Sequence, residues 1–265
     1  MITAGIDIGS VAAKAVLFDH DTGRVLARRS QPSGYDHAET VRDLLAATAT
    51  KAGIESGTIT ALGATGYGRM AAKNTPAFTG KSAARVVSEI RCHAKGAHFL
   101  CPEVNAVIDI GGQDSKAIRL DAQGEVADFV MNDKCAAGTG RFLLMAATIL
   151  EMDLPSFSQA AASGEAIAIN SMCAVFAESE IVSLIARRVR REHIAAGIIE
   201  SIAQRAASLA RRLDTRGLFA FSGGLATSQT MANRLAAALG GKLTVPEQPQ
   251  FCGALGAALL AAEGQ

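Results

Sequence analysis

The stretch that decides the fold is residues 107–121, VIDIGGQDSKAIRLD, because residues 5–19, GIDIGSVAAKAVLFD, repeat its pattern without a gap. Seven positions keep the same residue at a constant offset, and five of them are Asp7 and Asp109, Gly9 and Gly111, Lys14 and Lys116, Ala15 and Ala117, Asp19 and Asp121. Each copy reads as an apolar strand, a tight glycine turn and a second apolar strand. That pattern is typical of a β-hairpin with a glycine-rich tip.

Helical patterns follow each hairpin, at 38–52 and 83–94 after the first and at 140–150 and 174–213 after the second. Strands that alternate with helices favour α/β domains. We expect a first domain over residues 1–100 and a second over 101–252. The C-terminal helix, at about 253–263, is expected to pack back on the first domain, and its small residues predict a close helix crossing.

Composition excludes several classes of protein. Hydrophobic residues make up 49% of the 265 residues, which argues against disorder, and the net charge of +1 argues against nucleic acid or an anionic membrane as partner. No apolar run reaches the ~20 residues of a membrane span, and no secretory signal opens the chain. Five cysteines are too few and scattered for a disulfide scaffold. We expect a cytoplasmic protein with reduced thiols.

The residues of the two hairpins suit a site for metal and phosphate. Asp7 and Asp109 are expected to hold Mg²⁺ through water, because Mg²⁺ gives up its water reluctantly. The residues expected to bind the phosphates at the tips are Gly9, Ser10, Lys14, Gly111 and Gly112. Gln113 is the candidate for orienting an attacking water. For one hairpin alone, a plain glycine turn is the better interpretation, and the repeat reverses that preference.

A third element is the apolar segment 219–226, FAFSGGLA, which ends in a turn at Gly223 and Gly224. Such a turn lets a flat adenine ring lie against the backbone. The order of hairpin, hairpin and glycine pair resembles the superfamily of sugar kinases, Hsp70 and actin. The resemblance implies two actin-like (ribonuclease H-like) domains with an ATP cleft between them, in which Gly223 and Gly224 bind the adenosine.

Two cysteines stand in similar settings. Cys135 lies in NDKCAAGTGRFL (132–143) and Cys173 in NSMCAVFAESE (170–180), each between polar cap candidates and an apolar periodic run. Each is therefore expected near a helix N-terminus, where the helix dipole favours a thiolate. Across a two-fold dimer the pair would supply four thiolates for an iron–sulfur cluster or for zinc. From spacing alone, two packed cysteines remain the simpler interpretation.

The motifs around these cysteines resemble the activator ATPases of 2-hydroxyacyl-CoA dehydratases, in the BadF/BadG/BcrA/BcrD-type group. TGYGR (65–69) and SEIRCHAKGA (88–97) extend the likeness, which runs from Gly5 to about Ala261. The resemblance implies a homodimer with one [4Fe–4S] cluster, held by Cys135 and Cys173 of both subunits, and Gly138 joins the ATP-binding residues. It further implies an electron passed from ferredoxin or flavodoxin to an iron–sulfur dehydratase or reductase, driven by ATP hydrolysis.

Rival interpretations remain open. Within the family, the chain could serve a benzoyl-CoA reductase-like or double-cubane-cluster system. Outside it, a small-molecule kinase or a nucleotide-gated scaffold would use the same fold, although no clear carboxylate base for a kinase is visible. Cys92, Cys101 and Cys252 are predicted to be core thiols. The arginine run 187–191 is interpreted as a solvated face of one long helix, with docking to an acidic partner as the alternative.

Overall fold

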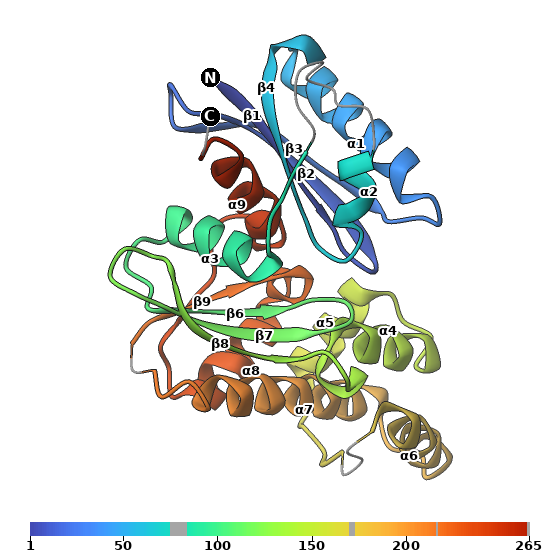
Figure 1. The fold of residues 1–265 in the computed structure, drawn as a ribbon. Coiled ribbons are helices and arrows are strands. Elements are labelled where there is room, and N and C mark those ends of the chain that lie inside the picture. The colour runs from blue at the N-terminus through green and yellow to red at the C-terminus, as the bar shows by residue number, and fades with distance from the viewer. Residues whose placement is uncertain (75–83, 170–172, 216, 264–265) are drawn as a thin grey trace. The chain divides into compact units, whose positions relative to one another are not determined.

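The computed structural model describes residues 1–74, 84–169, 173–215 and 217–263. The chain forms two compact units (Figure 1). The first comprises Met1–Glu103, Leu120–Ala127 and Pro246–Gln265, and the second comprises Val104–Arg119 and Asp128–Val245. Both units contain a mixed five-stranded sheet with helices, so the α/β class and the two hairpins predicted from the repeat are confirmed.

The sheet of the first unit has the strand order β3-β2-β1-β4-β5. Its strands are β1 (Ile2–Ile8), β2 (Ala12–Asp19), β3 (Arg24–Pro32), β4 (Ile59–Thr65) and β5 (Arg85–Val86). β1 and β2 form the first repeat hairpin, in which Asp7 lies opposite Lys14. On its other edge β1 runs parallel to β4, and there Asp7 lies opposite Thr65. Asp7 thus stands at the centre of the sheet, near the carboxyl ends of two parallel strands.

The helices of the first unit are α1 (His37–Ala52), α2 (Arg69–Asn74), α3 (Glu89–Leu100) and α9 (Cys252–Ala261). α9 packs on α3, β1 and β4 (Figure 1). The packing is close because glycines face it: a Cβ on Gly5, Gly63 or Gly96 would overlap the α9 backbone, and one on Gly256 would overlap Cys92 of α3. The predicted close crossing of this helix is confirmed.

The second unit repeats the design with the order β10-β9-β6-β7-β8. Its strands are β6 (Ala106–Ile110), β7 (Ser115–Leu120), β8 (Val126–Asn132), β9 (Phe219–Ser222) and β10 (Leu243–Thr244). In the hairpin of β6 and β7, Asp109 lies opposite Lys116, and β6 runs parallel to β9 with Asp109 opposite Ser222. The two carboxylates therefore occupy equivalent places in their sheets.

Five α-helices of the described residues belong to the second unit: α4 (Gly140–Ile149), α5 (Leu154–Ser163), α6 (Ala174–Ala186), α7 (Arg191–Arg211) and α8 (Gln229–Leu239). The core forms around α7, whose Ile198 and Ile202 are fully buried and join Ile108 of β6 and Phe221 of β9 in one apolar cluster. Short 3-10 turns lead into two of these helices, at Ala136–Gly138 before α4 and at Gly224–Thr227 before α8.

Two helix predictions need correction. The helix expected at 83–94 begins only at Glu89, because Arg85 and Val86 pair with β4 as a strand and Ser88 is the N-cap. The stretch 174–213 is not one helix, since α6 ends at Ala186, Arg188 adopts a positive φ of 59° and α7 begins at Arg191. Arg187, Arg188 and Arg190 therefore lie between the two helices, Arg191 is the first residue of α7, and the four arginines do not share one helix face.

The helices of the described ranges are too short or too polar for a membrane span.

Candidate active site and cysteine pair

The first unit buries the carboxylate of Asp7 beside a lysine. The residue is 4% exposed, and its Oδ2 lies 3.7 Å from Nζ of Lys14. Lys14 itself keeps 17% of its side chain exposed. The sequence predicted both residues at the site, and the hairpin register brings them together.

Space is kept open around Asp7 by two glycines. Its Oδ1 is buried and has no hydrogen-bond partner among the described residues. A Cβ on Gly66, which has a φ of +85°, would overlap this oxygen, and a Cβ on Gly253 would lie 3.0 Å from Oδ2. A buried charged oxygen without a partner is costly, so the carboxylate is suited to a water or a hydrated cation.

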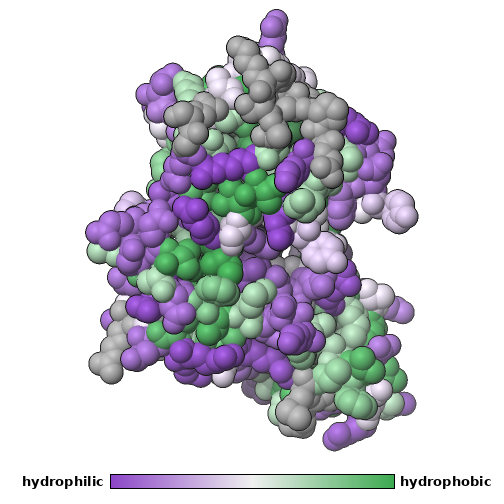
Figure 2. All heavy atoms as spheres, viewed as in Figure 1, coloured by the Kyte–Doolittle hydropathy of each residue, from purple (hydrophilic) through white to green (hydrophobic). Residues whose placement is uncertain are grey.

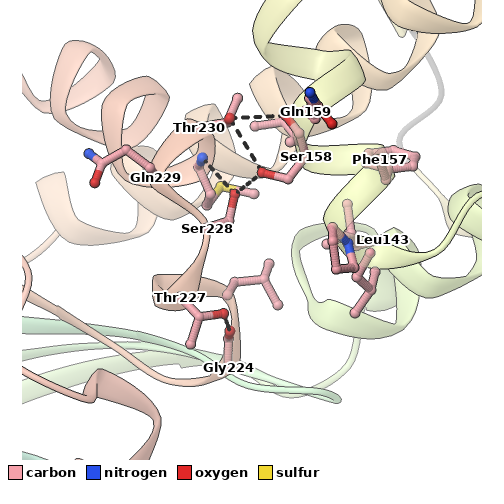
Figure 3. A pocket seen from close by; sticks show the side chains of 14 residues that line it. Leu143, Phe157, Ser158, Gln159, Gly224, Thr227, Ser228, Gln229 and Thr230 are labelled. Carbon is pink, nitrogen blue, oxygen red and sulfur yellow. Dashed lines mark hydrogen bonds between the residues drawn. The ribbon is translucent and has the colours of Figure 1, made fainter.

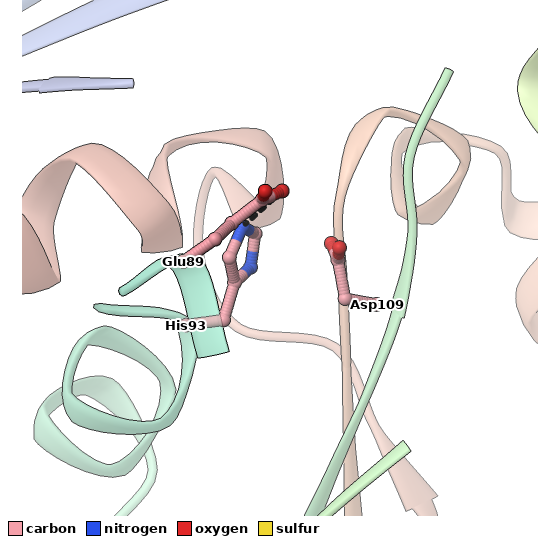
Figure 4. A group of neighbouring side chains, drawn as sticks. All are labelled: Glu89, His93 and Asp109. Carbon is pink, nitrogen blue, oxygen red and sulfur yellow. Dashed lines mark ion pairs between the residues drawn. The ribbon is translucent and has the colours of Figure 1, made fainter. Parts of the chain in front are cut away.

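The side of α3 near Gly253 carries a carboxylate and a histidine one turn apart (Figure 4). Glu89 Oε1 lies 4.0 Å from Nε2 of His93, which is 3% exposed. A Cβ on Gly253 would lie 2.8 Å from the same histidine nitrogen. His93 and Asp7 thus approach one glycine within the first unit. The sequence analysis assigned no ATP role to His93.

The second unit holds Asp109 more tightly than the first holds Asp7. Asp109 is 1% exposed, and its Oδ2 lies 3.4 Å from Nζ of Lys116, whose side chain is 2% exposed. Lys116 also bonds Asp114 Oδ1 at 2.7 Å, and Ser222 donates to Asp109 Oδ1 at 3.2 Å. Lys116 and Ser222 were not predicted as site residues, although the repeat that pairs Lys14 with Lys116 contained the signal for the lysine.

The first glycine of each hairpin tip uses its backbone N–H for a hydrogen bond across its own turn. Gly9 donates its N–H to Ala12 O at 3.2 Å, and Gly111 donates to Asp114 O at 2.9 Å. Within the described part of the chain, Ser10 and Gly112 donate no backbone hydrogen bond of this kind. They remain available to a phosphate oxygen, and Gln113 is exposed at the second tip.

The second tip is bonded to the start of α4. Gly140 N–H donates to Gly111 O at 2.9 Å, and Arg141 N–H donates to Gly112 O at 2.8 Å. Gly138, predicted to bind ATP, lies in the 3-10 turn before α4, where its carbonyl accepts a hydrogen bond from Ser115 Oγ. These hydrogen bonds join the tip of the second hairpin to the segment that follows Cys135.

A pocket of about 430 Å³ lies within the second unit beside the predicted adenosine motif (Figure 3). Gly224 and Leu225 form part of its lining, together with Phe157 and Ser158 of α5 and Ser228 at the start of α8. None of its 14 lining residues, all in the described ranges, carries a charge. The size is typical of a small-molecule site, and the neutral lining suits a base better than a phosphate. Only the glycine-pair end of this pocket could be predicted from sequence.

The two cysteines singled out by sequence both cap helical segments. Cys135 is the N-cap of the turn that leads into α4, and Cys173 is the N-cap of α6. Asn132 holds the backbone of Cys135 through two hydrogen bonds, of 2.9 Å to its carbonyl and 3.3 Å from its N–H. Both thiols belong to partly exposed residues, and α4 packs against α6. The predicted helix-N-terminal positions are confirmed.

The remaining cysteines are buried, as predicted. Burial raises the pKa of the Cys92 thiol to about 12, and a hydrogen bond with Thr65 opposes that shift only in part. Cys92 therefore stays protonated at physiological pH and makes a poor metal ligand.

The helix that Cys173 begins exposes a run of apolar side chains (Figure 2). Val175 and Phe176 are 70% and 71% exposed, and Val182 and Ile185, further along α6, are also exposed. In the figure the region of α6 is a green area at the lower right. Large apolar side chains clustered on one exposed helix are typical of a protein interface.

Comparisons with known proteins identify relatives of this chain along nearly its whole length. The activator of lactoyl-CoA dehydratase from Anaerotignum propionicum is 41% identical over 99% of this chain and 98% of its own. A 2-hydroxyisocaproyl-CoA dehydratase activator from Clostridioides difficile is 38% identical over 98% of this chain and 95% of its own. The solved activator of the 2-hydroxyisocaproyl-CoA dehydratase from Clostridium difficile, with bound ADPNP, superimposes with a TM-score of 0.90 at 38% identity, over 98% of this chain and 94% of that one.

The two-unit α/β architecture is thus the actin-like ATPase fold of these activators. Residues 4–261 match the BadF/BadG/BcrA/BcrD ATPase family as a whole. With its duplicated carboxylate hairpins, its neutral pocket at the glycine pair and this match, the chain belongs to the BadF/BadG/BcrA/BcrD ATPase family.

Proposed function

We propose that this chain is a cytoplasmic, homodimeric activator that couples ATP hydrolysis to the transfer of one electron to a partner iron–sulfur enzyme, a 2-hydroxyacyl-CoA dehydratase. The observation that carries the proposal is the pair of partly exposed cysteines, one before the turn that leads into α4 and the other at the start of α6, which packs against α4. One of these segments is bonded directly to a phosphate tip of an ATPase.

At the nucleotide end, the neutral pocket beside Gly224 takes the adenosine, and the backbone of Ser10 and Gly112 takes the phosphates. Lys14 contributes positive charge, and its 17% exposed side chain keeps it available to solvent and ligand. Gln113, exposed at the second tip, orients the water that attacks the γ-phosphate. The products are ADP and inorganic phosphate.

Asp7 and Asp109 are the residues that would hold Mg²⁺. The fit rests on Asp7, whose buried Oδ1 lacks a partner among the described residues and faces a space that Gly66 and Gly253 keep clear. Mg²⁺ would neutralise the charge that develops on the phosphate oxygens. Lys116 and Ser222 keep the Asp109 carboxylate in one orientation.

Cys135 and Cys173 of both protomers are the proposed ligands of one [4Fe–4S] cluster. They are the two partly exposed cysteines of the chain, and each begins a helical segment. A bound cluster would supply one-electron chemistry, with reduced ferredoxin or flavodoxin as the proposed electron donor and the partner enzyme as the acceptor. The exposed apolar side chains of α6, with Val175 and Phe176 in its first turn, form the proposed contact between protomers.

Coupling follows from the bonds between the second tip and α4. A shift of Gly111 and Gly112 on loss of the γ-phosphate would pull on the first turn of α4, because both glycine carbonyls accept from that turn. The segment preceding α4 begins at Cys135. ATP thereby favours one of two arrangements of the cysteine-bearing segments.

The deciding experiment is the iron and acid-labile sulfide content of anaerobically purified protein, with absorption spectra before and after dithionite. We expect four irons and four sulfides per dimer. Cys135→Ala should lose them, while Cys101→Ala, at a buried position, should keep them. Protein that cannot take up iron yet hydrolyses ATP would overturn the electron-transfer role and favour a kinase or a nucleotide-gated scaffold.

A further inference from the structure

The walls of the neutral pocket come from two separate stretches of the second unit. One wall is the start of α5, with Phe157 and Ser158, and the other is the adenosine turn and the start of α8, with Gly224 and Ser228 (Figure 3). A flat ligand can contact both walls at once only if the distance between the walls matches its thickness. Some contact between the two walls must therefore set the width of the pocket.

Three hydroxyl groups join the walls at the edge of the pocket. Ser158 Oγ lies 2.7 Å from Ser228 Oγ and 3.3 Å from Thr230 Oγ1, and Thr230 Oγ1 donates to the Ser158 carbonyl at 3.0 Å. Figure 3 shows the three side chains converging. We refer to Ser158, Ser228 and Thr230 as the hydroxyl latch.

One proton assignment uses every hydroxyl of the latch once. Ser228 donates to Ser158, Ser158 donates to Thr230, and Thr230 donates to the Ser158 carbonyl. The Ser228 oxygen then remains free to accept the N–H of Met231 at 3.2 Å, which caps α8. The latch thus ties α5 to the very turn that follows the adenosine glycines.

We propose that the hydroxyl latch sets the width of the base pocket, and that Ser158 is a positioning residue for the purine ring of ATP. This inference rests on the proposed function of the pocket. Ser158 acts on the base alone, because the phosphate tips lie on β-hairpins that the latch does not touch. Loss of the Ser158 hydroxyl therefore lowers the contribution of the base to ATP affinity and leaves the contribution of the phosphates unchanged.

The experiment compares Mg²⁺-ATP with Mg²⁺-tripolyphosphate, which carries the phosphates without a base, in calorimetric titrations of the anaerobically purified dimer. Ser158→Ala should weaken ATP binding about 5-fold, the size of one net hydrogen bond, and leave tripolyphosphate binding unchanged. In turnover, KM for ATP should rise while kcat stays within a factor of about two. Ser158→Thr keeps the hydroxyl and should restore ATP affinity.

Ser163→Ala is the matched control. Ser163 lies at the other end of α5 and is exposed, and among the described residues its hydroxyl bonds only within its own helix, to Ala160 O. Unchanged ATP affinity in Ser158→Ala, or an equal loss for both ligands, would overturn the latch. Wild-type protein that binds tripolyphosphate as tightly as ATP would overturn the base pocket itself, which separates that failure from failure of the latch alone.

Discussion

Gly66 and Gly223 occupy the same position in the two units. Each directly follows a strand that runs parallel to the first strand of a hairpin, and each has a positive φ, +85° and +91°. A Cβ on either glycine would overlap the Oδ1 of the hairpin carboxylate, Asp7 or Asp109. The repeat therefore extends beyond the hairpins to the strand and glycine that complete each carboxylate site.

Gly66→Ala should lower ATP turnover by roughly 10²-fold, the penalty for displacing a reacting group by about 1 Å. The new methyl would push the Asp7 carboxylate from its place, and the positive φ adds strain. Steady-state phosphate release measures the effect. Gly57→Ala, at a glycine with open space around it and no positive φ, is the control, and equal turnover in both variants would contradict the steric argument.

The two lysines should differ in their contribution to stability. Lys116→Met should lower the free energy of unfolding by about 3–5 kcal/mol, because it leaves Asp109 buried without its ion partner. Lys14→Met should cost no more than about 1 kcal/mol, because the Lys14 pair is longer and the lysine is partly exposed. Urea unfolding monitored by circular dichroism would measure both. Equal losses would contradict the tighter hold on Asp109.

The cysteines should fall into two classes of reactivity. In cluster-free protein at pH 8, iodoacetamide should label Cys135 and Cys173 and leave Cys92 unlabelled, as read by peptide mass spectrometry. The pKa of Cys92 is raised to about 12, so its reactive thiolate is scarce until pH rises toward that value. In the unfolded chain the pKa of this thiol is 9.0, so above pH 9 the unfolded state loses its proton while the folded state keeps it. The contribution of Cys92 to the free energy of unfolding is therefore fully present below pH 9 and declines as pH rises toward 12. Native labelling of Cys92 at pH 8 would show that its burial is incomplete.

Phe176→Glu should weaken the proposed dimer. Losing one aromatic that the proposed dimer buries and adding a charge costs about 2 kcal/mol per protomer, which is about 4 kcal/mol per dimer or roughly 10³-fold in association. Sedimentation velocity at several concentrations would detect the shift to monomer. Ala237→Glu, at an exposed position of α8, adds the same charge elsewhere and should leave the association unchanged. A Phe176→Glu variant that stays dimeric would rule out the α6 face as the contact.

Much of this architecture could be predicted from the sequence because the repeat carries it. The register that opposes Asp7 to Lys14 follows from a two-stranded hairpin with a fixed tip, which is a local property. The helical N-terminal positions of Cys135 and Cys173 also followed from neighbouring cap residues. Such local signals survive without knowledge of the fold.

What sequence could not supply depends on distant segments. Ser222 contacts Asp109 across parallel strands that lie far apart in the chain, and Ser158 meets Ser228 from another helix. The helix expected at 83–94 failed for a related reason, because pairing with β4 turned Arg85 and Val86 into a strand. The arginine run 187–191 contains no glycine or proline, so nothing in the sequence indicated that the helix ends there, where Arg188 adopts a positive φ.

The position of α9 also has a consequence for synthesis on the ribosome. The strands β1 and β4 and the helix α3 are synthesised early. The helix α9, which packs closely against Gly5, Gly63 and Gly96, is synthesised only after the whole second unit. The second unit can complete its sheet and core while the first still lacks a wall. The nascent first unit must therefore keep an apolar sheet face uncovered through most of translation, which makes it the part of the chain most in need of a chaperone.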